Sequence, residues 1–174
     1  MRKYLIDSNS FMESAEKFYN YEIAPTYWTK LIDAASKKGC LYVLDVVADE
    51  ISRGKDDDPL RVWFSENESS FNRISQSSDN MIVGIYAQVL QYVQECGYYN
   101  EKALRNWSND GIADPWLIAA AKVHDLVIVT FERRQGGLST TSKTGCVKIP
   151  DVADYFDVET ISLYTMMREL GIRL

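Results

Sequence analysis

Short apolar runs alternate along the chain with longer segments in which apolar residues recur every three or four positions. The runs predict buried strands and the longer segments predict helices. Strands are predicted at residues 3–6, 40–44, 126–129 and 147–149. Helices are predicted at 11–18, 25–38, 45–54, 60–67, 81–96 and 101–107, in a segment that begins at 114, and at 158–170. Because strands that alternate with helices are typical of a parallel sheet covered on both faces, we expect one domain over residues 1–174. Its expected fold is a helix-rich, three-layer α/β/α arrangement around a short, mostly parallel central sheet.

Residues with start and stop preferences mark the expected helix ends. Asp114 and Pro115 stand where a helix begins, and the carboxylate of Asp114 is expected to cap it. Ser10 and Asp45 are expected to cap the helices that follow the first and second strands, and Gly39 is expected to end the helix at 25–38. The Asp114 helix thus places a carboxylate at the positive end of a nearly buried apolar helix.

The composition narrows the classes of protein to which the chain can belong. The net charge of −6 argues against broad, nonspecific nucleic-acid binding, which goes with a basic surface. Three scattered cysteines favour reduced thiols and a cytoplasmic location, and no secretion signal or membrane-spanning run is recognised. The single histidine, His124, excludes zinc sites built from several histidines.

Four acidic residues are expected to meet at the carboxyl ends of the strands. Asp7 directly follows the first strand, Glu132 follows the strand at 126–129, and Asp114 begins the helix that precedes that strand. Glu50 lies in the helix after the second strand. Ligands of open parallel sheets bind beyond the carboxyl ends of the strands. Four ionised carboxylates cannot share such a place without compensation, and oxygen ligands favour Mg²⁺ or Mn²⁺ as the compensating ion.

A divalent ion held in this way favours hydrolysis of a phosphodiester, because it polarises the phosphate and lowers the pKa of an attacking water. Ser8, Asn9 and Thr130 could support the carboxylates by hydrogen bonds. Each acid alone has an ordinary structural explanation, as a turn former, an exposed helix residue, a helix cap or a loop residue. Only the set at consistent strand ends indicates catalysis. Three further acids compete for these roles, namely Asp45, Asp49 and Asp110.

Four segments in this order resemble the PIN domain, namely residues 4–9, 46–51, 113–121 and 127–132. The resemblance implies a metal-dependent ribonuclease, and many PIN domains are toxins of VapBC-type toxin–antitoxin pairs. It also implies that Asp7, Glu50 and Asp114 bind the metal and that Asn9 and Thr130 support them. Glu132 falls at the fourth acidic position, where the family usually has Asp. An antitoxin would then cover the acidic groove, and a homodimer is expected by analogy.

Substrate contacts would come from basic residues near the acids. Arg53 and Lys55 follow the Glu50 helix, and Arg133 and Arg134 begin a loop rich in Gly, Ser and Thr. These side chains could bind RNA phosphates, or they could simply be solvated loop residues.

Two other functions remain open from the sequence. The chain could be a catalytically silent PIN-like binding module. A phosphatase of the haloacid dehalogenase type also has an acid after its first strand, but it needs a second Asp where Asn9 stands.

Overall fold

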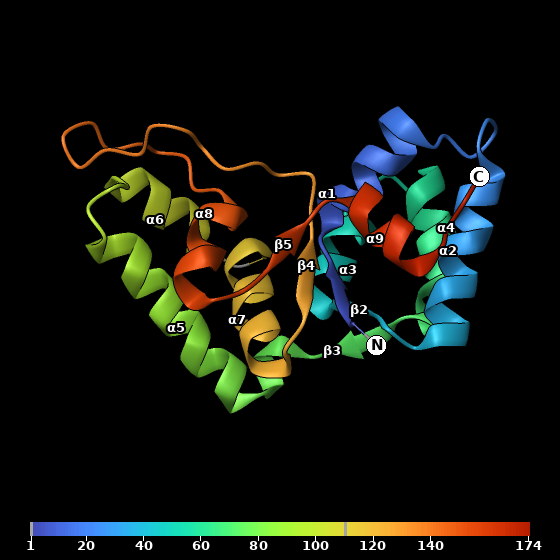
Figure 1. Cartoon of the computed structure of the whole chain (residues 1–174), viewed down its shortest axis with the longest axis horizontal. Helices are drawn as coiled ribbons and strands as arrows, with labels where there is room; N and C mark the ends of the chain where they lie inside the picture. The colour runs from blue at the N-terminus through green and yellow to red at the C-terminus, as the bar shows by residue number, and fades with distance from the viewer. Residues whose placement is uncertain (1, 110) are drawn as a thin grey trace.

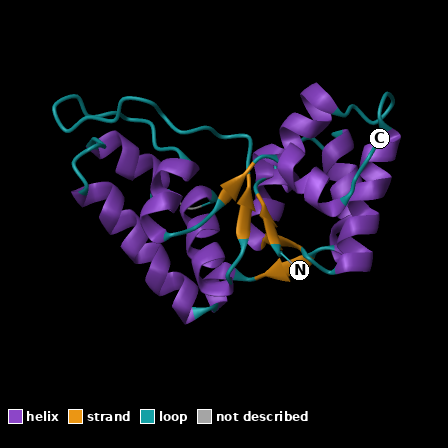
Figure 2. Ribbon diagram, viewed as in Figure 1, coloured by secondary structure: helices purple, strands orange, loops and turns teal. Residues whose placement is uncertain are grey.

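A parallel sheet lies between two groups of helices in the computed structural model, which describes residues 2–109 and 111–174 (Figures 1 and 2). Within these residues five strands form the sheet in the order β3-β2-β1-β4-β5, and every pairing is parallel. The strands are β1 (Tyr4–Ile6), β2 (Leu41–Leu44), β3 (Asn72–Ile74), β4 (Val127–Val129) and β5 (Thr160–Ile161). The expected helix-rich α/β fold with a short parallel sheet is therefore confirmed.

The α-helices account for about half of the described chain. They are α1 (Ser8–Glu13), α2 (Pro25–Lys38), α3 (Asp45–Ser52), α4 (Pro59–Asn67), α5 (Asn80–Glu95), α6 (Glu101–Trp107), α7 (Asp114–His124), α8 (Ile149–Ala153) and α9 (Leu163–Leu170). Single turns follow or precede some of them: the π-helical η1 (Ser14–Phe18) and the 3₁₀ turns η2 (Glu68–Ser70), η3 (Gln76–Ser78) and η4 (Asp154–Phe156). Figure 1 shows α5, α6, α7 and α8 on one side of the sheet and α1, α2, α4 and α9 on the other. In the described part of the chain, no helix combines the length and apolar character needed to cross a membrane.

The sequence identifies the three central strands and misses both edges. The predicted strands at 3–6, 40–44 and 126–129 correspond to β1, β2 and β4. The predicted strand at 147–149 is wrong, because Ile149 begins α8 with Pro150 in its first turn. The edges are instead β3, which carries polar residues, and the two-residue β5, which lies where a longer C-terminal helix was expected.

Three expected helix caps are also wrong, and two of these side chains have other partners. Ser10 lies inside α1 and donates to the carbonyl oxygen of Val129 at 3.0 Å. Asp45 is the first residue of α3 and its carboxylate accepts from the Arg73 guanidinium at 2.7 Å. Asp114 is the first residue of α7 and makes no capping hydrogen bond. Gly39 does end α2, with φ at 59°.

Packing in the core holds the carboxyl ends of β1 and β4, where the acids lie. All three residues of β1 are buried, and so is most of α7. Helix α7 packs along α5, where the rings of Trp116 and Tyr86 stack with centroids 3.8 Å apart. Since α7 lies against β4 and carries Asp114 at its first position, this packing fixes that carboxylate relative to the strand ends.

Candidate functional site

Asp7 is the most buried acid at the carboxyl ends of the strands. The register pairs Ile6 of β1 with Val129 of β4, so the next residues, Asp7 and Thr130, are neighbours. The Thr130 hydroxyl donates to the Asp7 carboxylate at 2.7 Å, and Asp7 is only 1% exposed. Burial raises the pKa of Asp7 to about 7, and the charges of Glu132 and Glu50 act in the same direction. The Thr130 hydroxyl and the backbone N–H of Asn9 lower it in part.

Asp114 faces the same place from the first turn of α7. Its pKa is raised well above the ordinary value, first by burial and then by the charges of Asp7, Glu132 and Glu50. Among the described residues none donates a hydrogen bond to its carboxylate. The structure thus brings the four acids together at the carboxyl ends of β1 and β4, where their charges raise the pKa of Asp7 and Asp114.

Glu50 ties three segments together at this edge. The Ser8 hydroxyl of α1 donates to its Oε2 at 2.5 Å, and the backbone N–H of Ala113 donates to its Oε1 at 3.0 Å. Ala113 directly precedes Asp114, so the Glu50 carboxylate positions the start of α7. Ser8 and Thr130 therefore both hydrogen bond to the acids, as expected of supporting residues. Asn9 contributes its backbone N–H to Asp7, and its side-chain oxygen accepts from the Thr130 hydroxyl and the Phe131 N–H, both at 3.4 Å.

Glu132 is held by a lysine that sequence reasoning gave no role. Its side chain is 14% exposed, and it accepts from the Lys148 ammonium at 2.6 Å and from the Ile149 N–H at 2.8 Å. The ion pair raises the pKa of Lys148, and the ammonium lowers the pKa of Asp114. No signal in the sequence alone separates Lys148 from other loop lysines, because its partner lies sixteen positions away.

The donor set fits a hard divalent cation held by few protein ligands. Among residues 2–109 and 111–174, no group of three His, Cys, Asp or Glu side chains is arranged to bind one metal ion. Mg²⁺ usually retains several waters and binds one or two carboxylates together with substrate phosphates. Asp7 and Asp114 would supply two such carboxylates, and Glu50 and Glu132 each accept one hydrogen bond at each oxygen from protein donors.

The competing acids lie elsewhere. Asp45 pairs with Arg73 and Asp49 is exposed on α3. Asp110 lies outside the described residues.

The four basic residues proposed for substrate contact divide into two groups. Arg53 donates to the carbonyl oxygen of Gly111 at 3.3 Å, in the loop that leads to α7, and Lys55 is exposed nearby. Arg133 and Arg134 are exposed after β4, and Arg134 forms an ion pair with Asp154. Only Arg133 and Arg134 line a hollow that also contains Glu132.

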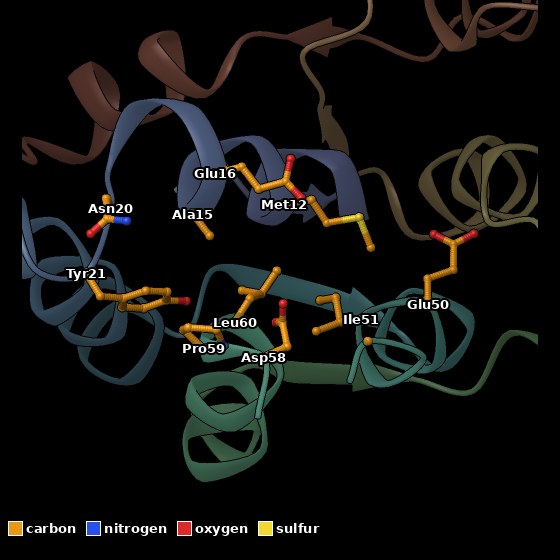
Figure 3. A pocket seen from close by; sticks show the side chains of 11 residues that line it. Met12, Ala15, Glu16, Asn20, Tyr21, Glu50, Ile51, Asp58, Pro59 and Leu60 are labelled. Atoms are coloured by element: carbon orange, nitrogen blue, oxygen red, sulfur yellow. The ribbon is translucent and has the colours of Figure 1, made fainter. Parts of the chain in front are cut away.

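A separate pocket of about 350 Å³ includes Glu50 in its lining and lies between residues of α1 and η1 on one side and of α3 and α4 on the other (Figure 3). Figure 3 shows Met12 and Ala15 on one wall and Ile51 and Leu60 on the other. The acidic side chains of Glu16, Glu50 and Asp58 also line this pocket, and none of its described lining residues is basic. Its apolar walls and negative charge suit an apolar, basic ligand rather than a phosphate.

Comparison with known proteins places the chain in a family. The family model described as Domain of unknown function (DUF4411) matches residues 4–174. The chain belongs to this family. No curated protein matches it.

Solved structures show what fold this DUF4411 member has. It is similar to VapBC2 from Rickettsia felis, solved bound to a DNA fragment from their promoter, with a TM-score of 0.57 and 12% identity over 91% of this chain and 97% of that chain. It is also similar to PAE2754 from Pyrobaculum aerophilum, with a TM-score of 0.52 and 14% identity over 99% and 97% of the two chains. Identities this low show the fold alone. The chain therefore has the PIN-like fold that its sequence predicts.

Proposed function

We propose that this protein is an Mg²⁺- or Mn²⁺-dependent endoribonuclease that hydrolyses RNA phosphodiesters. The observation that carries the proposal is the burial of Asp7 beside Asp114 at the carboxyl ends of β1 and β4, with the pKa of both raised. Carboxylates in this position are unfavourable without a cation, and strongly shifted groups of this kind gather at functional sites. The PIN-like fold supports the choice of RNA as substrate by analogy.

Asp7 and Asp114 would hold the cation, and Glu50 would complete the acidic set through its contacts with both neighbouring elements. When bound, the ion supplies charge stabilisation at the scissile phosphate and a more acidic attacking water. Thr130 orients Asp7 by donating to Oδ2, and Ser8 orients Glu50. These hydroxyls keep the carboxylates in place before any ion or substrate arrives.

Glu132 and Lys148 would act as a neutral pair in this site. The carboxylate accepts one hydrogen bond at each oxygen, which hold it against Lys148 and the start of α8. The Lys148 ammonium offsets part of the effect of the Glu132 charge on Asp114. It lowers the cost of bringing a phosphate up to the acidic edge.

The direct test is cleavage of single-stranded RNA with Mg²⁺, with Mn²⁺ and with EDTA. We expect cleavage only with metal, and a loss of at least about 100-fold in Asp114→Asn. Asp49→Asn, which removes an exposed acid from α3, is the matched control and should cleave normally. Equal cleavage by Asp114→Asn and the control would refute the proposal.

We further propose that the protein is the toxin of a toxin–antitoxin pair and that an antitoxin segment binds the pocket of Figure 3. The apolar walls formed by Met12 and Leu60 suit an apolar side chain, and Glu16 and Asp58 suit a basic one. A small DNA-binding protein encoded beside this gene should bind tightly and inhibit cleavage. Ala15→Trp, which fills the pocket, should weaken that complex while leaving cleavage intact. A homodimer remains a prediction by analogy, and a cytoplasmic location remains a prediction from the three scattered cysteines.

One observation favours a catalytically silent binding module as the second candidate. Both oxygens of Glu132 and both of Glu50 accept hydrogen bonds from protein donors, and Asp7 accepts from Thr130, so within the described residues Asp114 is the one acid of the four whose carboxylate accepts none. A silent module would bind RNA or a protein partner without cleaving RNA under any metal condition.

A further inference from the structure

Three aromatic rings gather beside the acids at the ends of β4 and β5. Phe18 of η1 stacks on Phe131, which follows β4, with centroids 5.1 Å apart and planes inclined by 30°. Tyr164 of α9 meets both rings edge-on, at 6.1 Å and 5.9 Å. Phe18 is 45% exposed and Tyr164 is 42% exposed. Three separate segments thus present a partly exposed aromatic cluster, which we name the Phe18–Phe131–Tyr164 cluster.

A hollow of about 600 Å³ joins this cluster to the candidate active site. Phe131 and Tyr164 line it together with Thr130 and Glu132. Thr130 is the residue that donates to Asp7, so the inner end of the hollow lies next to the buried carboxylates. A chain-like ligand in the hollow would therefore contact Thr130 and Glu132, the two residues of the candidate site that line it.

The charge of this hollow differs from that of the pocket in Figure 3. Arg133 and Arg134 both line the hollow, and Arg134 is paired with Asp154. Arg133 is exposed and has no ion pair within the described part of the chain. Its charge is therefore available to an anionic ligand, whereas the pocket of Figure 3 is lined by acids and no base.

We propose that the Phe18–Phe131–Tyr164 cluster binds an unpaired base of single-stranded RNA, and that Arg133 binds an adjoining phosphate. This inference rests on the proposed function and names how its substrate is held. Aromatic rings stack on any base, because every base has a π-face. Bases inside a duplex are already stacked and cannot reach the rings. The cluster therefore selects single strands with little preference for sequence.

The first test measures binding of a fluorescently labelled eight-nucleotide single strand by anisotropy, in EDTA so that no cleavage occurs. Loss of one stacking ring is worth about 5-fold to 100-fold in affinity. We expect Tyr164→Leu and Phe18→Leu to weaken binding by that factor. Tyr155→Leu is the matched control, since Tyr155 is 64% exposed and stacks on Tyr92 away from the hollow. Thermal unfolding of each variant checks that it is folded.

The second test separates the base contact from the phosphate contact. An abasic strand of the same length and charge should bind the wild type at least 5-fold more weakly than the natural strand and should not distinguish Tyr164→Leu from wild type. Binding is also measured over a range of salt concentrations. Arg133→Gln should reduce the slope of log affinity against log salt concentration by the amount expected for the loss of about one phosphate contact. Lys37→Gln, which removes a charge at the opposite end of the sheet near the start of β2, should not.

The outcomes distinguish this inference from the proposed function. If the ring variants bind the strand as tightly as Tyr155→Leu, or if the wild type does not bind it, the inference is overturned even where RNA is cleaved. If ring-dependent binding is found without cleavage under any metal condition, the inference stands and the proposed function fails. Ring variants that alter only self-association would assign the cluster to a second copy of the chain and would also overturn the inference.

Discussion

Replacing Asp7 by Asn should stabilise the metal-free protein, and should do so more at high pH than at low pH. Asp7 is 1% exposed, and burial raises its pKa from 3.8 to about 7. Between these two values the native protein holds a proton that the unfolded chain has released. The stability that this proton confers is fully present below pH 4 and is lost as the pH rises to about 7. Asn carries no charge, and its carbonyl oxygen can still accept from Thr130.

The magnitude follows from the shift. Each tenfold change in proton affinity is worth about 1.4 kcal/mol, so ionising Asp7 in the native state costs about 4 kcal/mol in total. About 1.5 kcal/mol of this cost is already present at pH 5. The gain in the free energy of unfolding from Asp7→Asn should therefore grow by about 2 to 3 kcal/mol between pH 5 and pH 8.

The assay is urea unfolding of wild type and Asp7→Asn in EDTA at both pH values. Other groups titrate in both proteins, so most of their effect cancels in the difference. Asp49→Asn serves as the control, because that exposed acid should change stability by no more than about 0.5 kcal/mol at either pH. The reasoning is refuted if the difference in the free energy of unfolding between Asp7→Asn and wild type stays constant from pH 5 to pH 8. It is also refuted if Asp7→Asn is less stable than wild type at pH 8.

Three other predictions concern residues around the site. Lys148→Met should lower stability by about 1 to 3 kcal/mol in thermal unfolding, because Glu132 then keeps only one donor, and Glu132→Gln in the same chain should recover most of the loss. Gly111→Ala should cost about 1 to 2 kcal/mol, because Gly111 has φ at 86° and a Cβ would meet the Arg53 guanidinium. Arg53→Ala in that variant should relieve only the contact and not the backbone strain. Mg²⁺ at 100 times its Kd should stabilise the wild type by about 2.7 kcal/mol at pH 8, and unchanged unfolding would count against a metal site.

The sequence was sufficient for the centre of the fold because the central strands are apolar and end in chemically distinctive residues. β1 and β4 are continuous apolar runs, and Asp7 and Thr130 follow them directly. The two edge strands, β3 and β5, were missed because they lack such apolar runs. β3 has polar side chains and β5 has only two residues, so neither gives a periodic signal. Val147–Ile149 has strand-like composition, yet Pro150 places it at the start of a helix.

The candidate site was predictable as a set of positions and not as a set of contacts. The predicted strand ends and helix starts placed Asp7 and Asp114 together at the carboxyl ends of the strands, and in the structure their charges interact there. The partners of Glu50 and Glu132 depend on which backbone N–H and ammonium groups come near them in space. Lys148 and the Phe18–Phe131–Tyr164 cluster come from segments far apart in the chain, and no local pattern marks them.

The central claim is that Asp7 and Asp114 share a divalent cation, and calorimetric titration with Mn²⁺ tests it most directly. At pH 8 the wild type and Asp49→Asn should bind Mn²⁺ with the same affinity, whereas Asp7→Asn and Asp114→Asn should each lose most of that binding. The account is contradicted if the wild type takes up no Mn²⁺, or if both Asn variants bind it as the wild type does.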